Sequence, residues 1–477
     1  MKVRKQQLVK RHRRNKRLAL LVLLASTLVS SITISPWLLP LVPLLGWLIN
    51  EAWFSDHIFY SPREDYLYRF PDDVQPIALH VTHGRWRFDN SDSSMTLDKS
   101  TLIARVRLRS TWLGRLLDPV LLIGNDRQTF ERGARGLRYV NLTGQGEALS
   151  TSGLSVLSRY CVVGSTVELF VFGSPEGAID DIMILAPHAD DAELAAFGLY
   201  SAADRVSIVT LTQGEIEAQY YQRLGLGREE ASQLKGRLRT WDSLSIPLWG
   251  GVAAKNCIQL GYYCMQLSSM EEQPDIPVGS KESGETDIRT ARQHNGIELP
   301  ADADGLPTWS NLVADLAACL MHFKPRVVVM PHPELDPHAD HIASTRAFFQ
   351  ALNESDWQPE QLLLYANHLH DNDRWPMGDA NTGVALPPAM VELPADKVFS
   401  FVLNSQQQLD KAMALLMHHD LQPPLPFKKL LRRQIQRVLA GRRWPNTGEN
   451  EFLRKAVRKH EIFWVRNVGG ISEKNIS

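Results

Sequence analysis

The feature that most constrains this chain is an uncharged apolar run near its N-terminus, from Leu18 to Asn50. The run is longer than the ~20 apolar residues that a membrane-spanning helix needs. The residues before it carry no acidic side chain and nine basic ones: Lys2, Arg4, Lys5, Lys10, Arg11, Arg13, Arg14, Lys16 and Arg17. We therefore predict a basic tail over residues 1–17, followed by a transmembrane anchor over residues 18–50.

Two arrangements of this anchor are open. Basic residues beside a first span stay in the cytoplasm, so a single crossing would place the rest of the chain on the extracytoplasmic side. Pro36, Pro40 and Pro43 could instead split the run into a hairpin that returns the chain to the cytoplasm. A cleaved signal peptide fits less well, because its apolar region spans only about 7–15 residues. We favour the single crossing and keep the hairpin as the alternative.

Length and composition indicate a folded protein with more than one domain. The chain has 477 residues, of which 44% are hydrophobic and 22% charged, which is enough to bury two cores. The formal net charge of −1 gives no electrostatic reason to expect a nucleic-acid partner. The four cysteines lack the paired spacing of a thiolate zinc site. Cys257 and Cys264 could form a disulfide, but buried free thiols are the simpler interpretation.

Residues 51–175 have the pattern of antiparallel β structure. The stretch from Ala104 to Arg109 alternates apolar residues with arginines, which predicts a strand with one buried and one wet face. Similar short runs occur at residues 78–81, 120–123, 137–142 and 167–172. We expect a small β-sandwich-like domain. A structural spacer is its simpler role, and carbohydrate recognition is the alternative.

From residue 176 to residue 477 the pattern changes to alternating strands and helices. We predict strands at 182–186, 206–211, 327–330 and 362–365, and helices at 192–200, 312–323 and 341–352. This rhythm predicts a parallel sheet covered by helices on both faces. Residues 268–307 are polar and are expected to form an inserted loop or flap. Past Pro424 the chain is basic and helical, with Lys428, Lys429, Arg432 and Arg433 on a solvated face or against anionic lipid or substrate.

Two polar motifs follow predicted strands directly. PHADDAE spans residues 187–193, and PHPELDPHADH spans residues 331–341. Ligands of open α/β sheets bind at the carboxyl ends of strands, so two such loops can meet at one site. Either motif alone is more often a turn and helix cap. Together they supply the imidazoles and carboxylates that suit zinc.

The chemistry of metal-assisted hydrolysis assigns a role to each side chain. His188, Asp191 and His341 would provide the two histidines and one carboxylate of a catalytic Zn²⁺ site. Asp190 would take the proton of the attacking water, and His338 would stabilise the oxyanion. Asp340 would orient a histidine. His332 and Asp336 are ambiguous, and we expect them to shape the loop by hydrogen bonds.

These residues carry a family resemblance. PHADDAE resembles the AHPDDE signature of the PIG-L/LmbE-like deacetylases, and PHPELDPHADH resembles their second motif, in which an aspartate precedes an HxDH group. LTQGE at 211–215, REEA at 228–231 and LGY at 260–262 look like weaker blocks of the same family. The resemblance covers most of residues 182–465. It implies a Rossmann-like fold, hydrolysis of N-acetyl groups on glucosamine-containing compounds, and the same roles for the residues named above.

The sequence departs from the family pattern at two positions. Ala189 stands where the family has proline, and Ala192 stands where the signature has glutamate, with Glu193 one place later. We predict a membrane-anchored, zinc-dependent N-deacetylase that acts on an N-acetylated sugar or glycolipid such as an N-acetylglucosamine derivative. The alternatives are a catalytically inactive carbohydrate-binding protein on the same fold, and a phosphoesterase, for which the sequence has no convincing phosphate clamp.

Overall fold

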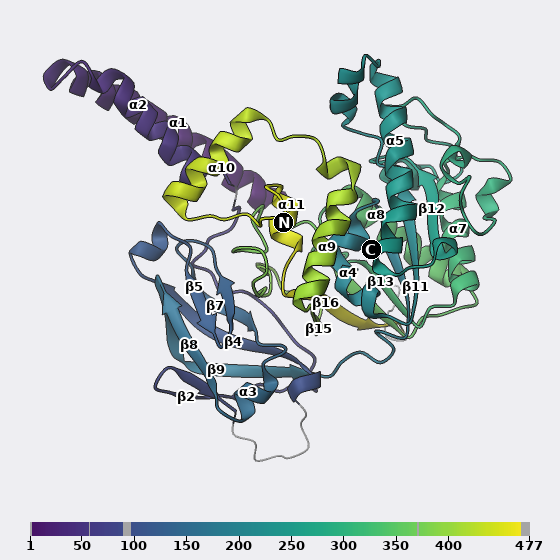
Figure 1. Cartoon of the computed structure of the whole chain (residues 1–477), viewed down its shortest axis with the longest axis horizontal. Coiled ribbons are helices and arrows are strands. Elements are labelled where there is room, and N and C mark those ends of the chain that lie inside the picture. The colour runs from purple at the N-terminus through teal and green to yellow at the C-terminus, as the bar shows by residue number, and fades with distance from the viewer. Residues whose placement is uncertain (1, 57, 89–96, 370–371, 469–477) are drawn as a thin grey trace.

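The computed structural model describes residues 2–56, 58–88, 97–369 and 372–468. Figure 1 shows a helical arm that projects from a β-rich part and a larger α/β part. The expected mixed α/β chain with an apolar N-terminal helix is therefore confirmed.

The arm consists of α1 (Lys2–Thr33) and α2 (Leu38–Ile49), and it continues into the π-helical turn η1 (Asn50–Phe54). Within α1, Gln7–Thr33 is long and apolar enough to cross a membrane, by length and composition. After the turn at residues 34–37, α2 returns along α1 (Figure 1). A Cβ atom on Gly46 would lie 2.6 Å from Leu23 Cδ2, so the missing side chain permits this close approach. The apolar run is thus two antiparallel helices.

The β-rich part contains two antiparallel sheets. One has the order β1-β9-β4-β7 and the other the order β2-β3-β8-β5-β6. Apolar residues of both sheets, among them Val106 and Leu121, share one buried cluster. The elements are β1 (Ile77–Ala78), β2 (His80–Thr82), β3 (Arg85–Arg87), β4 (Thr101–Ser110), β5 (Val120–Ile123), β6 (Asp126–Thr129), β7 (Arg135–Asn141), α3 (Gly146–Ser150), β8 (Leu154–Arg159) and β9 (Cys161–Phe172).

The larger part is built on a seven-stranded sheet of order β12-β11-β10-β13-β14-β16-β15. Strands β12 to β14 pair in parallel, whereas β16 runs antiparallel to both of its neighbours, so the expected all-parallel sheet is wrong at this edge. The strands are β10 (Asp181–Ala186), β11 (Arg205–Thr212), β12 (Cys257–Tyr262), β13 (Val327–Pro331), β14 (Gln361–Tyr365), β15 (Lys397–Val402) and β16 (His460–Asn467).

Helices cover both faces of this sheet because alternate residues of its strands point to opposite sides. Met183 and Leu185 of β10 join the core under α7 and α8, while Ile182 and Ile184 join the core under α4 and α9. The helices are α4 (Asp191–Ala202), α5 (Arg228–Ser245), α6 (Leu267–Glu272), α7 (Trp309–Phe323), α8 (Ala339–Glu354), α9 (Ser405–Met417), α10 (Phe427–Ala440) and α11 (Glu451–Ala456).

Two further expectations can be compared with the structure. Residues 268–307 carry the end of α6 and short 3₁₀ turns, but Ile288 and Leu299 are buried in the main core, so much of this segment is packed rather than a free flap. All four cysteines are free and buried, so the disulfide between Cys257 and Cys264 is not formed.

Candidate metal centre

The two polar motifs meet because their strands are neighbours. β10 ends at Ala186 and β13 at Pro331, and the two strands pair in parallel, with Ile182 opposite Val327. Each motif therefore leaves the same edge of the sheet, where its loop leads into a helix. Asp190 occupies the N-cap of α4, and His338 occupies the N-cap of α8.

Three side-chain atoms converge at this edge. Asp191 Oδ2 lies 3.1 Å from His188 Nδ1 and 3.1 Å from His341 Nε2. The two imidazole nitrogens are 3.4 Å apart. His341 and Asp191 are almost completely buried, and His188 is 12% exposed. The structure thus brings together the three residues that we predicted as metal ligands.

The spacing of these atoms fits a zinc ion. Zinc bonds of ~2.0–2.1 Å at tetrahedral angles would hold ligand atoms ~3.3 Å apart. The observed separations of 3.1–3.4 Å are close to that value. Two imidazoles and one carboxylate are also a standard catalytic ligand set that leaves a fourth position open. The donor chemistry and the geometry agree.

Other potential ligands surround the trio. Ligand atoms lie within 4.8 Å of one another in three overlapping groups, which are His188 with His338 and His341, His188 with Cys264 and Asp340, and Asp191 with His341 and His368. We favour the trio of His188, Asp191 and His341 because its ligand atoms lie 3.1–3.4 Å apart and combine two imidazoles with a carboxylate.

Both ligand histidines have a carboxylate on the nitrogen that faces away from the centre. His188 Nε2 lies 3.2 Å from Asp340 Oδ2, as expected for an orienting partner. His341 Nδ1 lies 2.9 Å from Asp336 Oδ2, a contact that the sequence had left ambiguous. Such contacts fix the tautomer and the ring orientation of a metal-binding histidine. His332, by contrast, shapes the loop, since its Nδ1 accepts from the backbone of Glu334 and Leu335.

In the trio, the carboxylate of Asp191 and the imidazoles of the two histidines shift one another's pKa values. Burial raises the pKa of Asp191, but the imidazoles of His341 and His188 outweigh burial and lower that pKa well below its usual range. Burial lowers the pKa of His341, but the carboxylates of Asp191 and Asp336 outweigh burial and raise it to about 9. A bound metal cation would replace the imidazole protons as the positive charge that balances these carboxylates.

Asp190 points to a different partner from its neighbour Asp191. Its Oδ1 accepts from Arg239 Nη2 at 2.8 Å, and the guanidinium of Arg239 is buried. Burial raises the pKa of Asp190, but Arg239 outweighs burial and lowers it, so the carboxylate stays ionised. Sequence reasoning missed Arg239, which lies on α5 and is distant from both motifs in the sequence.

His338 lies against both ligand histidines, with its ring centroid 4.8 Å from that of His188 and 5.0 Å from that of His341. Burial and the neighbouring imidazoles lower its pKa to about 4, so the ring is neutral at pH 7. A neutral imidazole still carries one N–H donor. His338 Nδ1 is buried and has no hydrogen-bond partner among the described residues.

A third loop contributes residues that sequence reasoning did not identify. Asn367 follows β14, the next strand of the sheet, and its Nδ2 donates to Asp191 Oδ1 at 2.8 Å. The ring of His368 stacks on that of His338 at 5.1 Å. The signal for both was available, since polar residues directly follow a predicted strand here as they do in the two motifs.

The structure also explains the displaced glutamate of the first motif. Ala192 is packed in the core beneath α4. Glu193 is fully buried on the far side of the helix, where its Oε1 accepts from the Tyr200 hydroxyl and its Oε2 lies 3.3 Å from His418 Nε2. Its carboxylate therefore supports the packing of α4. Ala189 is likewise buried.

Comparison with known proteins identifies the segment that carries both motifs. Residues 183–352 match the family model described as PIG-L: GlcNAc-PI de-N-acetylase. The match covers 170 of the 477 residues of the chain. The matched segment contains most of β10, α4, β13, most of α8 and the loops between them, and all six predicted site residues lie within it. This match supports N-deacetylase activity. No curated protein matches the chain.

Solved structures show only remote similarity. A triple mutant of a deacetylase from the teicoplanin biosynthetic pathway is 15% identical, over 61% of this chain and 100% of its own, with a TM-score of 0.32. The zinc-inhibited form of teicoplanin deacetylase Orf2 is 15% identical, over 61% of this chain and 99% of its own, with a TM-score of 0.32. GalB, the 4-carboxy-2-hydroxymuconate hydratase of Pseudomonas putida KT2440, is 12% identical over 54% of this chain and 83% of its own, with a TM-score of 0.28.

Proposed function

We propose that this chain is a zinc-dependent N-deacetylase that hydrolyses the N-acetyl group of an acetamido sugar. In this proposal residues 176–477 form the Rossmann-like deacetylase domain, and residues 51–175 form a β-sandwich-like domain that supports it. Residues 1–50 attach both to a membrane. His188, Asp191 and His341 hold the metal, Asp190 is the general base, His338 is the oxyanion-side group and Asp340 orients His188.

One observation carries the proposal. Two imidazole nitrogens and one carboxylate oxygen from two separate loops lie 3.1–3.4 Å from one another at the carboxyl edge of the sheet. Unliganded side chains seldom need such convergence, whereas a tetrahedral zinc ion requires it. The carboxylates on the outer nitrogens of both histidines support the same interpretation.

The chain's own residues supply the remaining chemistry. A zinc ion bound here would bring the pKa of a water molecule toward ~7 and polarise an amide carbonyl. Asp190, held ionised by Arg239, would accept a proton from the attacking water. His338 would donate its N–H to the oxygen that becomes negative as the amide carbon turns tetrahedral. The C–N bond then breaks, and the amine leaves with a proton while acetate is released.

Acetate release from N-acetylglucosamine derivatives by the purified full chain tests this function. Removal of metal with a chelator should abolish the release, and added zinc should restore it. Asp190→Asn should keep bound metal but lower turnover by about 10²–10⁴-fold, the usual contribution of a general base. His341→Ala should lose the metal itself. Asp204→Asn, an exposed aspartate outside the site, is the matched control and should leave activity unchanged.

Three results would count against the proposal. Zinc bound with full affinity by His341→Ala would place the metal elsewhere. Full activity of Asp190→Asn would remove the base assignment. A zinc-loaded chain that binds acetamido sugars and releases no acetate would favour a carbohydrate-binding protein over an enzyme.

A further inference from the structure

α10 is an amphipathic helix whose apolar face points away from the protein. Surface helices of globular proteins turn their apolar stripe toward the core. On α10 the side chains that point outward include Phe427 and Val438, which are 78% and 79% exposed, and Leu431, which is 37% exposed. These positions share one helix face, because they are four and seven residues apart. On this outward apolar face of α10, most of the surface of Phe427 and Val438 is free of contact with the described residues.

The polar face of α10 is the one that packs on the protein. Gln436 Nε2 donates to Ser55 Oγ at 3.0 Å, and Arg432 pairs with the buried carboxylate of Glu51. Arg433 is buried with its guanidinium 5.1 Å from the centre of the Trp444 ring. The helix is therefore fixed in its orientation by polar contacts, and these contacts keep its apolar face outward.

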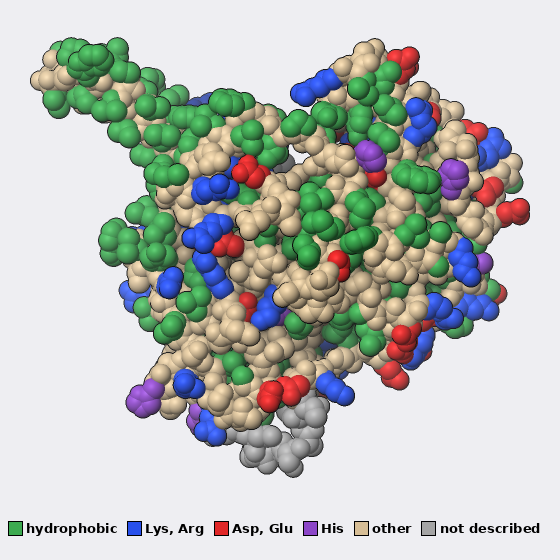
Figure 2. All heavy atoms as spheres, in the orientation of Figure 1, with side chains coloured by type: hydrophobic (Ala, Val, Ile, Leu, Met, Phe, Trp, Pro, Cys, Tyr) green, Lys and Arg blue, Asp and Glu red, His purple; other side chains and the backbone are tan. Residues whose placement is uncertain are grey.

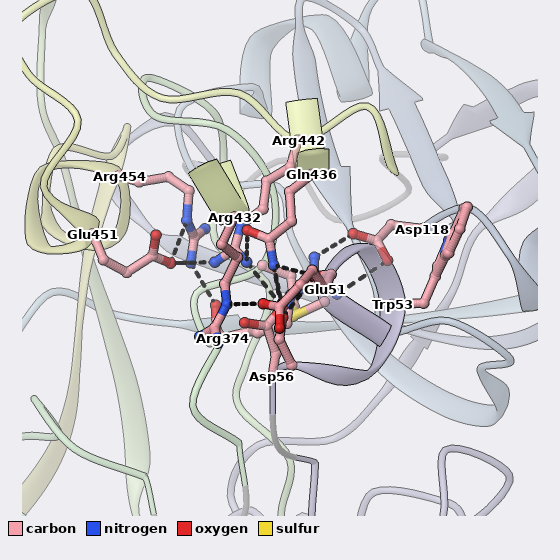
Figure 3. Close-up of polar contacts among 12 residues, drawn as sticks. Glu51, Trp53, Asp56, Asp118, Arg374, Arg432, Gln436, Arg442, Glu451 and Arg454 are labelled. Carbon is pink, nitrogen blue, oxygen red and sulfur yellow. Dashed lines mark hydrogen bonds and ion pairs between the residues drawn. The ribbon is translucent and has the colours of Figure 1, made fainter. Parts of the chain in front are cut away.

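The same contacts attach α10 to the base of the helical arm (Figure 3). Glu51 and Ser55 lie in or directly after η1, where α2 enters the body of the protein. Asp56 pairs with Arg442 at 2.9 Å. Burial raises the pKa of Asp56, but Arg442 and Arg374 outweigh burial and lower it. Trp53 Nε1 donates to the backbone of Leu116 at 2.7 Å. The arm is thus anchored rigidly beside α10.

The arm itself has the surface of a lipid-embedded element. Figure 2 shows apolar side chains covering its outer part on the face in view. Trp37 at the tip is 82% exposed, and Ile32 is 77% exposed. In its apolar part, the hydroxyls of Thr27 and Thr33 donate to carbonyls four residues back. Satisfied polar groups are what a hydrocarbon environment demands.

The uncharged part of each arm helix is shorter than the hydrocarbon core of a bilayer. The apolar part of α1, Leu18–Thr33, extends about 24 Å at ~1.5 Å per residue, and α2 with its 12 residues extends about 18 Å. The hydrocarbon core of a bilayer is ~30 Å thick. Both ends of the hairpin also lie at the body, with Leu8, Arg11 and Asn15 of α1 near Trp53.

Basic side chains mark the level at which the apolar surface begins. Lys10, Arg13, Arg14, Lys16 and Arg17 are exposed on the part of α1 next to the body. On α10, Lys428 and Lys429 are exposed beside Phe427, and Arg437 lies 3.3 Å from Glu449. Basic residues that flank an apolar helix face suit the anionic headgroups of a membrane surface.

We infer that the arm and the outward apolar face of α10 form one membrane-docking surface, which enters a single leaflet of a bilayer containing anionic phospholipids. The arm dips into the hydrocarbon as a hairpin, and α10 lies flat at the headgroup boundary. The basic tail and the catalytic domain then stay on the same side of the membrane. This inference is independent of the catalytic proposal, because it concerns lipid contact alone.

Depth measurements with a fluorescent label on α10 test the inference. Val438→Cys in the full chain, labelled with bimane, would be compared with Leu224→Cys, which is 69% exposed and ends the 3₁₀ turn η4 (Ala218–Leu224) before α5. The native cysteines are buried and should not react. In vesicles of phosphatidylcholine and phosphatidylglycerol with brominated acyl chains, we expect several-fold stronger quenching at position 438. Equal quenching at the two positions would overturn the role of α10.

The lipid charge gives a second readout. Quenching at position 438 should rise several-fold when phosphatidylglycerol is added to phosphatidylcholine vesicles. Adding Lys428→Gln and Lys429→Gln to the labelled chain should weaken this dependence, while the basic residues of α1 keep part of it. Quenching that is the same with and without the anionic lipid would overturn the headgroup contact.

The sidedness of the arm can be measured directly. Detergent-purified Lys10→Cys and Leu224→Cys chains would be diluted onto preformed vesicles and treated with a membrane-impermeant maleimide. A hairpin leaves both positions outside, so both should be modified completely. Protection of position 10 with full modification of position 224 would show a spanning helix and would overturn the hairpin.

Discussion

Proton competition at His341 should make zinc binding strongly dependent on pH. Asp191 and Asp336 hold the His341 pKa at about 9, against the lowering effect of burial. At pH 7 the ring lies about two units below that pKa, so release of its proton costs about 2.7 kcal/mol. A metal can bind only to the neutral ring, and half of the rings are still protonated at pH 9, so the apparent affinity should rise about fiftyfold between pH 7 and pH 9.

His188 acts in the same direction. Burial lowers its pKa, but hydrogen bonds to Asp191 and Asp340 outweigh burial and raise it well above the usual value. The change of about fiftyfold is therefore a lower bound. For the metal-free chain the sign is opposite, because a histidine with a raised pKa stabilises the fold while it is charged. That stability is fully present below pH ~6.5 and is lost as the pH rises through about 9.

Competition against a chromophoric zinc chelator, corrected for the chelator's own protonation, measures the affinity at each pH. Calorimetry at pH 7 in two buffers of different ionisation enthalpy should show at least one proton released per zinc bound. His322→Ala, an exposed histidine whose ring packs on Phe323, should keep the full dependence. A change below threefold between pH 7 and pH 9, with no proton release, would refute the reasoning.

Three further outcomes follow from the described contacts. Glu461→Gln should lower the free energy of unfolding, measured by chemical denaturation, by about 3–5 kcal/mol. Its carboxylate pairs with Lys411 at 2.8 Å, so the substitution leaves a buried unpaired charge. A loss below 1 kcal/mol would contradict this. Burial raises the pKa of Glu334, but His332 and Arg466 outweigh burial and lower it to about 2. Its stabilising contribution is therefore present above pH ~4.5 and is lost as the pH falls toward 2, so Glu334→Gln should reduce the acid sensitivity of unfolding, and an unchanged acid midpoint would argue against the ion pairs. Zinc at a hundredfold excess over its Kd should stabilise the chelated chain by about 2.7 kcal/mol, measurable as a rise in Tm, whereas an unchanged Tm would mean that the folded state has no specific site.

The sequence predicted the parts of the site that depend on strand ends. A motif that directly follows a buried strand has its position fixed by the sheet. The sequence alone therefore predicted that His188, Asp191 and His341 lie close together. Asp340 could be assigned as an orienting residue by chemical need alone. Arg239 could not be found in this way, because an arginine inside a helix gives no local sign of which distant carboxylate it meets.

The strands of the sheet likewise divide into those that the sequence predicts and those that it does not. Strands β10, β11, β13 and β14 are continuous apolar runs between helices, and their burial on both faces makes that pattern visible. β16 carries His460, Glu461 and Arg466 among its apolar residues, and its pairing depends on partners about 60 and 100 residues away. Its place inside the sheet is set by tertiary packing that no local pattern encodes.

The apolar N-terminal run shows how one composition permits two structures with opposite consequences. Hydropathy counts residues and cannot tell a long helix from a short pair, so a single crossing was the natural prediction for Leu18–Asn50. The turn at residues 34–37, which contains Pro36, reverses the chain, and the missing side chain of Gly46 lets the two helices pack closely. The ion pairs of Glu51 and Asp56 with Arg432 and Arg442 then tie the returning helix to the body. Contacts between residues nearly 400 positions apart therefore decide which way the N-terminal run is folded.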